Sequence, residues 1–255
     1  MMIRGGLAAF LVSVSVLGCS SSKAGGGGPG NDGGGDGAIV DSGGSGESAA
    51  EAGAAYPPGP YGINVGQVFP DVTWTGAHGA GATGSTGSAD YYDPDGSKGI
   101  RGVYFDVTVA SAGADAGGGT CPPCNQQAAA EESAYAGPPY DFSTRGGRIV
   151  DVLAQSWQGN GVDKPTTAAD IAPWVAENGI TYDVVIDPAP ATDAGSLMTS
   201  IGGFPAVPSI ILVDPRTMKV TARAGGVDPT QLQEGSAFDA LVVKNGAPSV
   251  DAGTD

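Results

Sequence analysis

Beyond about residue 100, apolar positions recur with two different periods, which predicts both strands and helices. Runs of β-branched and apolar residues at 102–110, 148–155 and 209–213 are typical of strands whose two faces are covered. Helix-forming residues at 121–136 and 167–178 separate them, and a glycine follows each of these two segments. Strands that alternate with helices predict an α/β protein.

Shorter patterns complete this prediction. Asp214-Pro215 forms a turn that joins 209–213 to a strand at 219–224, so we expect a mixed sheet with an antiparallel hairpin beside parallel strands. The stretch 76–89 is rich in Gly, Ser, Thr and Ala, which predicts a long loop. The other expected elements are extended segments near 65–75, a strand at 181–187, a short helix at 193–201 and a last helix at 229–243.

Residues 1–18 have the pattern of a signal peptide. Arg4 is followed by the apolar stretch 7–17, which is too short to span about 30 Å of hydrocarbon as a helix. The stretch ends in Val16-Leu17-Gly18-Cys19, which resembles the lipobox of bacterial lipoproteins. That resemblance implies that Cys19 is acylated and becomes the mature N-terminus. The alternative is an ordinary secretory signal with an incidental cysteine.

The residues that follow predict where the chain resides and how it is organised. Because Ser20 and not aspartate follows Cys19, the pattern resembles that of outer-membrane lipoproteins. We therefore expect an exported chain, lipid-anchored in the cell envelope at the outer membrane, on its periplasmic face or its surface. Residues 19–55 contain almost no large apolar side chain, which predicts a flexible tether after the lipidated cysteine. A folded domain at 56–246 and a polar tail at 247–255 complete the expected organisation.

The chain is strongly acidic, with 27 acidic and 11 basic residues and a formal net charge of −16. Such a chain repels phosphate backbones, and no cluster of Lys and Arg changes this locally, so we expect no nucleic-acid partner. Attachment to anionic lipid by charge is disfavoured for the same reason. Contact with a membrane is therefore expected only through the lipid anchor.

Two of the three cysteines, Cys121 and Cys124, remain available if Cys19 carries lipid. Their Cys-Pro-Pro-Cys motif lies between a predicted strand and a predicted helix. This spacing places both sulfurs on one side of the first helical turn, where a disulfide can close. The helix N-terminus favours a thiolate at Cys121, the predicted nucleophile, and Cys124 is the predicted resolving thiol. We therefore predict these two cysteines as the catalytic residues.

The two residues between the cysteines affect the chemistry of the pair. Pro122 and Pro123 are tolerated in a first helical turn, because its N–H groups have no intrahelical partner. They also remove amide donors that could stabilise a Cys121 thiolate, which predicts a reducing rather than a strongly oxidising pair. The serious alternative is a merely structural disulfide. A zinc site needs four ligands, and His78 is the only histidine, so we expect neither a metal nor another cofactor.

With these residues the chain resembles the thioredoxin-like redoxin family, and within it the extracytoplasmic, membrane-anchored thioredoxins. The resemblance runs from about residue 65 to 243. It is carried by the entry motif Gly66-Gln67-Val68-Phe69-Pro70-Asp71, the Cys-Pro-Pro-Cys motif after a long strand, Ala206-Val207-Pro208 before an apolar strand, and Gly225-Gly226 after the hairpin. It implies a thioredoxin-like fold, with a central mixed sheet flanked by helices and N-terminal extended segments.

The resemblance also implies a function. It implies a thiol-disulfide oxidoreductase that acts on exported protein disulfides or thiols, with protein thiols of the cell envelope and an unidentified electron donor as partners. A cis bond before Pro208 would leave the Val207 backbone able to pair with an extended substrate beside Cys121. Thr120, at the place where the family usually has an aromatic residue, supports the site together with Pro122 and Pro123.

The sequence also departs from the family pattern, and alternatives stay open. A glycine-rich insertion at 113–119 precedes Thr120, and Asp106 is the nearest candidate for the family's buried proton-transfer acid. One alternative is a non-catalytic surface lipoprotein that uses the fold as an interaction module with a structural disulfide. A peroxiredoxin-type peroxidase is less favoured, because the Thr-x-x-Cys motif with an upstream proline is missing.

Overall fold

The computed structural model describes residues 55–78, 82–111, 121–158, 162–164, 166–187 and 207–248. The elements in chain order are β1 (Thr73–His78), β2 (Ala82–Gly87), the 3₁₀ helix η1 (Ser88–Tyr91), β3 (Gly102–Ser111), α1 (Pro122–Ala136), β4 (Gly147–Gln158), β5 (Val162–Lys164), α2 (Ala168–Asn178), β6 (Asp183–Ile186), β7 (Ser209–Asp214), β8 (Lys219–Gly225), the 3₁₀ helix η3 (Pro229–Leu232) and α4 (Ala237–Lys244). No helix in this part of the chain is long and apolar enough to cross a membrane.

All the strands in the described ranges belong to one sheet, in the order β2-β1-β6-β4-β3-β7-β8, with β5 paired to β4. The central strands β6, β4 and β3 are parallel to one another. The hairpin of β7 and β8 joins them with β7 antiparallel to β3, as the turn at Asp214-Pro215 predicts. The prediction of an α/β protein with a central mixed sheet is therefore confirmed.

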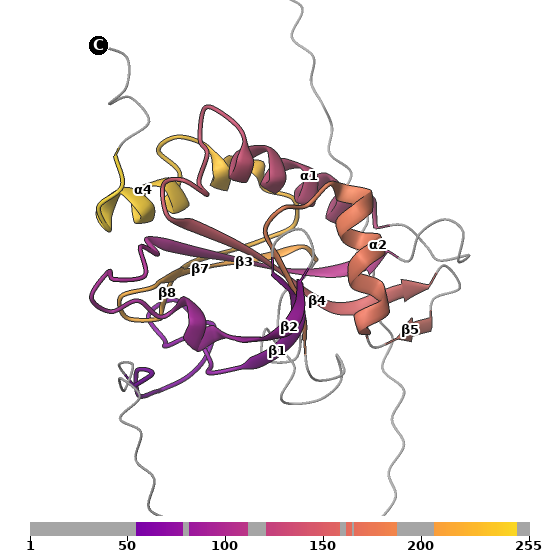
Figure 1. The fold of residues 1–255 in the computed structure, drawn as a ribbon, viewed down its shortest axis with the longest axis horizontal. Helices are drawn as coiled ribbons and strands as arrows, with labels where there is room; N and C mark the ends of the chain where they lie inside the picture. The colour runs from indigo at the N-terminus through magenta and orange to yellow at the C-terminus, as the bar shows by residue number, and fades with distance from the viewer. Residues whose placement is uncertain are drawn as a thin grey trace, which may run out of the picture. The chain divides into compact units, whose positions relative to one another are not determined.

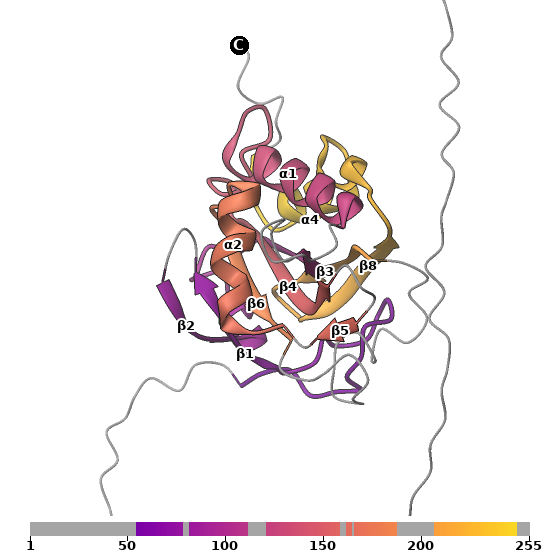
Figure 2. The same ribbon diagram turned by 90° about the vertical axis from the view of Figure 1, so that its right-hand side faces the viewer.

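Helices cover one face of this sheet. Figures 1 and 2 show α1, α2 and α4 on the same side of the strands. Because side chains alternate along a strand, Tyr104 of β3 and Leu153 of β4 point toward these helices. They pack in one core with Cys124 of α1, Trp174 of α2 and Phe238 of α4. The first turn of α1 is thus anchored on the sheet.

The N-terminal segment covers the opposite face. Phe69 stacks on Phe105 of β3 with 4.5 Å between the ring centroids, and Trp74 of β1 packs against both rings. Ile63 and Val68 belong to the same core. The expected extended segments before β3 therefore form the second layer of the fold.

The stretch 76–89, predicted to be a long loop, is instead largely a β-hairpin. It contains the second half of β1 and all of β2, so His78 lies in a strand. Gly76 lets β1 lie against β6, because a Cβ atom there would collide with the carbonyl oxygen of Val184. The glycine marks a close approach of two backbones rather than a turn, which is why composition alone misled the prediction.

The predicted last helix at 229–243 is also wrong as one element. It consists of η3 and α4, which are separated by a turn in which Gly235 has a φ of 71°. The Ser236 hydroxyl then accepts a hydrogen bond from the Asp239 N–H at 3.1 Å and so starts α4. The strand β5 was not predicted. The predicted helix at 193–201 lies outside the described residues.

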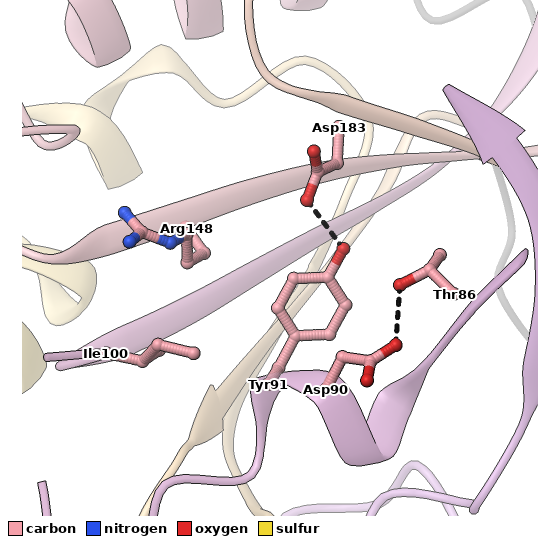
Figure 3. A pocket seen from close by; sticks show the side chains of 6 residues that line it. All are labelled: Thr86, Asp90, Tyr91, Ile100, Arg148 and Asp183. Carbon is pink, nitrogen blue, oxygen red and sulfur yellow. Dashed lines mark hydrogen bonds between the residues drawn. The ribbon is translucent and has the colours of Figure 1, made fainter. Parts of the chain in front are cut away.

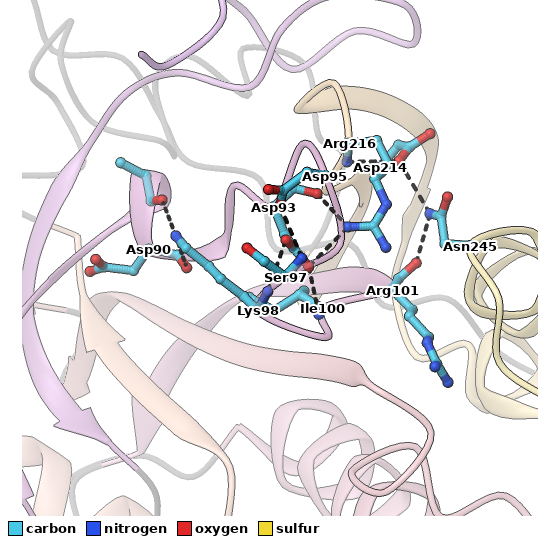
Figure 4. A network of polar contacts seen from close by, with 11 residues as sticks. Asp90, Asp93, Asp95, Ser97, Lys98, Ile100, Arg101, Asp214, Arg216 and Asn245 are labelled. Carbon is cyan, nitrogen blue, oxygen red and sulfur yellow. Dashed lines mark hydrogen bonds and ion pairs between the residues drawn. The ribbon is translucent and has the colours of Figure 1, made fainter. Parts of the chain in front are cut away.

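A network of polar contacts joins the loop before β3 to the turn between β7 and β8 (Figure 4). The buried Asp93 carboxylate accepts a hydrogen bond from the Ile100 N–H at 2.9 Å and forms an ion pair with Arg216 at 2.9 Å. Asn245, just after α4, donates to the Arg101 carbonyl oxygen at 2.8 Å. These contacts fix the start of β3, and therefore the strand that leads toward the cysteine pair.

Several predictions fall on residues that the structure does not describe. They concern the signal peptide at 1–18, the acylated Cys19 and the tether that follows, the insertion at 113–119, and Thr120. All of these stay predictions.

Candidate active site

Cys121 and Cys124 form a disulfide at the start of α1. Their Cα atoms are 5.3 Å apart, within the ordinary range for a disulfide. Cys121 directly precedes the first helical residue, and its carbonyl oxygen accepts the first helical hydrogen bond, from the Asn125 N–H at 3.1 Å. The motif therefore occupies the helix N-terminus that its spacing predicts.

The two cysteines differ in exposure. Cys124 is fully buried in the core under α1, whereas Cys121 is partly exposed at its edge. Pro122 and Pro123 are exposed and fill the first two helical positions, so two amide donors of this turn are missing. A partner approaching from solvent can therefore reach Cys121 but not Cys124.

Pro208 lies at the start of β7, and the peptide bond between Val207 and Pro208 is cis. The Pro208 carbonyl oxygen accepts a hydrogen bond from the Gly226 N–H at 2.8 Å, which ties it to the loop after β8. Val207 packs against the same core as Cys121. No residue in the described ranges hydrogen-bonds the Val207 main chain. The structure thus brings the predicted support residues Val207 and Pro208 to the core that carries the cysteine pair.

Three buried carboxyl groups lie between α1 and the sheet. Asp106 of β3 and Asp151 of β4 are paired in register on adjacent parallel strands, and each is at most 1% exposed. Glu131 lies on the inward face of α1, about one helical turn after Gln127 and about two turns after Cys124. One oxygen from each carboxyl group lies within 4.8 Å of the other two. We call Asp106, Glu131 and Asp151 the carboxyl cluster.

Neutral side chains surround the carboxyl cluster with hydrogen-bond donors. They come from α1, β3, α2 and the residue before β6. The hydrogen bonds run from Gln127 Nε2 to Glu131 Oε1 (2.9 Å) and to the Tyr104 hydroxyl (2.8 Å), from the Tyr182 hydroxyl to Glu131 Oε2 (3.0 Å), and from Trp174 Nε1 to Asp151 Oδ2 (2.8 Å). None of these donors carries a charge, so none of them balances the charge of an ionised carboxylate.

Burial raises the pKa of every member of the cluster. Burial and the charge of Asp151 hold the pKa of Asp106 well above its usual value. The Ser209 backbone and the Glu131 side chain lower the pKa of Asp106 and so oppose this shift in part. Burial and the two aspartates likewise raise the pKa of Glu131 well above its usual value.

Asp151 shares this burial with the other two members. Burial raises its pKa to about 6, and hydrogen bonds with Glu131, Trp174 and Tyr182 limit the shift. With these raised pKa values, the cluster holds protons at a pH at which exposed carboxyl groups are ionised. A cluster that changes its proton content near neutral pH, under a helix that carries a disulfide, is suited to proton exchange with a thiol.

The carboxyl cluster is also the one grouping of three such side chains, among the residues described, that could hold a metal ion. Carboxylate oxygens are ligands for hard divalent cations. Three carboxyl groups this close in a buried space must be neutralised in part, and protons can do this as well as a cation can.

Of the cluster, only Asp106 was identified from the sequence. Glu131 and Gln127 stand in the polar run Asn125-Gln-Gln-Ala-Ala-Ala-Glu-Glu132, which is typical of a solvated helix. The available signal was an acid in the middle of each of two apolar strands, at Asp106 and Asp151. Parallel neighbours bring two such acids together, but only the register of β3 and β4 shows that they meet.

A cavity of about 340 Å³ lies elsewhere, at the N-terminal ends of β4 and β6 (Figure 3). The Tyr91 hydroxyl donates to Asp183 at 2.8 Å across it, and burial followed by the Asp183 charge raises the pKa of Tyr91. Arg148 lines another side. Neither cysteine lines this cavity, and the pair follows the opposite, C-terminal end of β3. The cavity is therefore separate from the candidate active site.

No family model matches the sequence, and no curated protein is similar to it. Solved structures with a similar fold include a Chlorobium tepidum protein assigned as a thiol:disulfide interchange protein DsbE, with 17% identity, a TM-score of 0.46, and coverage of 72% of this chain and 98% of that one. A thiol:disulfide interchange protein from Bacteroides sp. has 20% identity, a TM-score of 0.41, and coverage of 66% and 86%. AhpC from Enterococcus faecalis has 13% identity, a TM-score of 0.46, and coverage of 67% and 88%.

These similarities are too remote to indicate an activity, so the assignment rests on the chain's own geometry. Three features of it agree: the strand order with β3 between β4 and the β7–β8 hairpin, the Cys-Pro-Pro-Cys disulfide at the head of α1, and the cis bond before Pro208 at the start of β7. The chain therefore has a thioredoxin-like α/β fold and resembles the thioredoxin-like redoxin family.

Proposed function

We propose that this protein is a thiol-disulfide oxidoreductase that acts on the disulfides or thiols of exported proteins through Cys121 and Cys124. The observation that carries the proposal is a disulfide at a helix N-terminus whose first cysteine is accessible and whose second is fully buried. A cycling pair needs this asymmetry, because one sulfur must meet the partner while the other resolves the mixed disulfide from within.

The proposed cycle begins with the reduced pair. The Cys121 thiolate attacks one sulfur of the partner disulfide, and the other partner sulfur leaves as a thiolate. Cys124 then loses its proton and attacks Cys121, which releases the second partner sulfur and closes the Cys121–Cys124 disulfide. Two electrons pass to the partner. Asp106, on the strand that leads to the cysteine pair, is the proposed acceptor of the Cys124 proton.

Other residues support binding in this proposal. An extended partner segment pairs with the Val207 main chain and lies beside Cys121, and Pro208 holds that main chain in place. Thr120, Pro122 and Pro123 form the rim over which the partner approaches. The two prolines withhold amide donors from the Cys121 thiolate, which favours net reduction of partner disulfides.

The proposed place of action is the cell envelope. An acylated Cys19 anchors the chain at the outer membrane, and the tether holds the domain away from the lipid. A separate thiol donor of the envelope reduces the pair after each cycle.

Reduction of insulin by dithiothreitol tests the proposal. The full chain in catalytic amounts is expected to accelerate insulin precipitation at least tenfold over a variant in which both Cys121 and Cys124 are serine. The double variant is the matched control, because it keeps the fold and lacks only the sulfurs. Equal rates for the two proteins would favour an interaction module with a structural disulfide.

A further inference from the structure

We propose that Glu131 is a positioning residue for the redox reaction. Together with Asp151 it shares the proton that Asp106 exchanges with Cys124. The proton of this site then belongs to all three members of the carboxyl cluster, which we call the pool, rather than to a single side chain. The inference rests on the proposed function, because it assigns the proton that the cysteine pair exchanges. It goes beyond that function in naming Glu131, Asp151 and Gln127.

The first support is charge balance in a buried space. The groups that face the pool come from every element packed around it: Tyr104 and Asp106 on β3, Glu131 and the more distant Glu132 on α1, Asp151 on β4, Trp174 on α2 and Tyr182 before β6. All of the titratable ones are acidic or phenolic. Three carboxylates this close cannot all ionise away from water, so they share protons.

The second support is the arrangement on α1. Cys124, Gln127 and Glu131 are each fully buried and follow one another along the same face of the helix. Asp106 lies opposite this face and next to Asp151 on the neighbouring strand. A proton that leaves Asp106 can therefore be replaced from Glu131 without crossing to solvent.

The third support is the position of Gln127. Its amide donates to Glu131 and to Tyr104, while its oxygen accepts the Asp228 N–H at 3.0 Å. Asp228 belongs to the loop that also holds the Pro208 carbonyl oxygen through Gly226. One buried amide thus joins the pool to the loop that contacts Pro208, and it holds Glu131 in a fixed orientation.

The proposed proton step applies when the pair is reduced. A donor thiolate attacks Cys121, the disulfide bond breaks, and its electron pair goes to the Cys124 sulfur. That sulfur takes the proton of Asp106 and becomes a thiol. Asp106, now a carboxylate, takes a proton from Glu131. The pool has then lost one proton, which it regains from solvent. A second thiolate of the donor then attacks the donor sulfur of the mixed disulfide formed at Cys121 and releases Cys121 as a thiolate. The donor ends as a disulfide and the Cys121–Cys124 disulfide is reduced by two electrons, so atoms and electrons balance.

The test is the pH dependence of the Cys121/Cys124 potential. The full chain is equilibrated with dithiothreitol buffers from pH 5 to 9, and the potential is plotted against pH. The slope of this plot gives the number of protons taken up per two electrons, and the pH at which the slope changes is called the break. A shared pool predicts that Glu131→Gln moves the break by at least one pH unit. Asp151→Asn must move it as well, and it carries the test if Glu131→Gln does not fold. Asp71→Asn, which removes an exposed carboxyl of the segment before β1, is the control and leaves the break unchanged.

The outcomes separate this proposal from the proposed function. If only Asp106→Asn moves the break, and Glu131→Gln and Asp151→Asn match the unmodified protein, the pool is refuted while the oxidoreductase stands. If the break moves as expected but insulin is not reduced, the pool stands and the proposed function fails.

Discussion

Changing Cys124 to serine is expected to turn the protein into a trap for its partners. The Cys121 thiolate of this variant can still attack a disulfide, but no second sulfur resolves the product, so a stable mixed disulfide accumulates. Turnover of insulin is expected to fall to the uncatalysed rate. Non-reducing electrophoresis of the variant mixed with insulin measures the product, and mass spectrometry locates the bond at Cys121.

The reciprocal variant is the control for this trap. Cys121→Ser retains only the buried sulfur of Cys124, which no partner can reach. It is expected to form no mixed disulfide. Equal trapping by both variants would contradict the assignment of Cys121 as the nucleophile.

The carboxyl cluster is expected to make the oxidised protein less stable as the pH rises. A carboxyl group whose pKa is raised by folding holds its proton more tightly in the folded state, so its contribution is favourable below the usual pKa and is lost as the pH rises through the folded value. For Asp151 the pKa rises from 3.8 to about 6. At ~1.4 kcal/mol per pKa unit, ionised Asp151 costs roughly 3 kcal/mol of unfolding free energy above pH 7.

Asp151→Asn therefore has an effect that depends on pH. The amide cannot ionise, and its oxygen can still accept the Trp174 N–H. The variant is expected to match the unmodified protein near pH 4 and to exceed its unfolding free energy by about 2–3 kcal/mol at pH 8. Urea unfolding at the two pH values measures this, with the exposed Asp71→Asn as a control. A variant that is equally destabilised at both pH values would show that Asp151 is a structural hydrogen-bond partner only.

The central elements could be predicted because their signals are local. The strands β3, β4 and β7 are rich in β-branched and other apolar residues, and α1 and α2 each end before a glycine. The hairpin of β1 and β2 was missed because its stability comes from pairing with β6, which a sequence of small residues does not show. Gly76 makes that pairing possible, because a Cβ atom there would collide with the backbone of β6.

The candidate site was predictable only in part. The cysteine pair and Pro208 follow motifs with a fixed order, so the sequence predicts them directly. Glu131 and Asp151 enter the site through the burial of a polar helix face and the register of two parallel strands. Neither property has a local pattern, because helical periodicity assigns polar positions to solvent. An acid in the middle of an apolar strand is the one signal in such a sequence that indicates a buried carboxyl group.

The redox titration of the Cys121/Cys124 pair tests the central claim most directly. The full chain is equilibrated with buffers of reduced and oxidised dithiothreitol at pH 7, its thiols are alkylated, and the reduced fraction is measured by mass spectrometry. The account predicts one reversible two-electron transition with a potential between about −300 and −200 mV, the range of reducing and intermediate thiol-disulfide proteins. A pair that stays oxidised to potentials well below about −300 mV would be a structural staple, and the account would be contradicted.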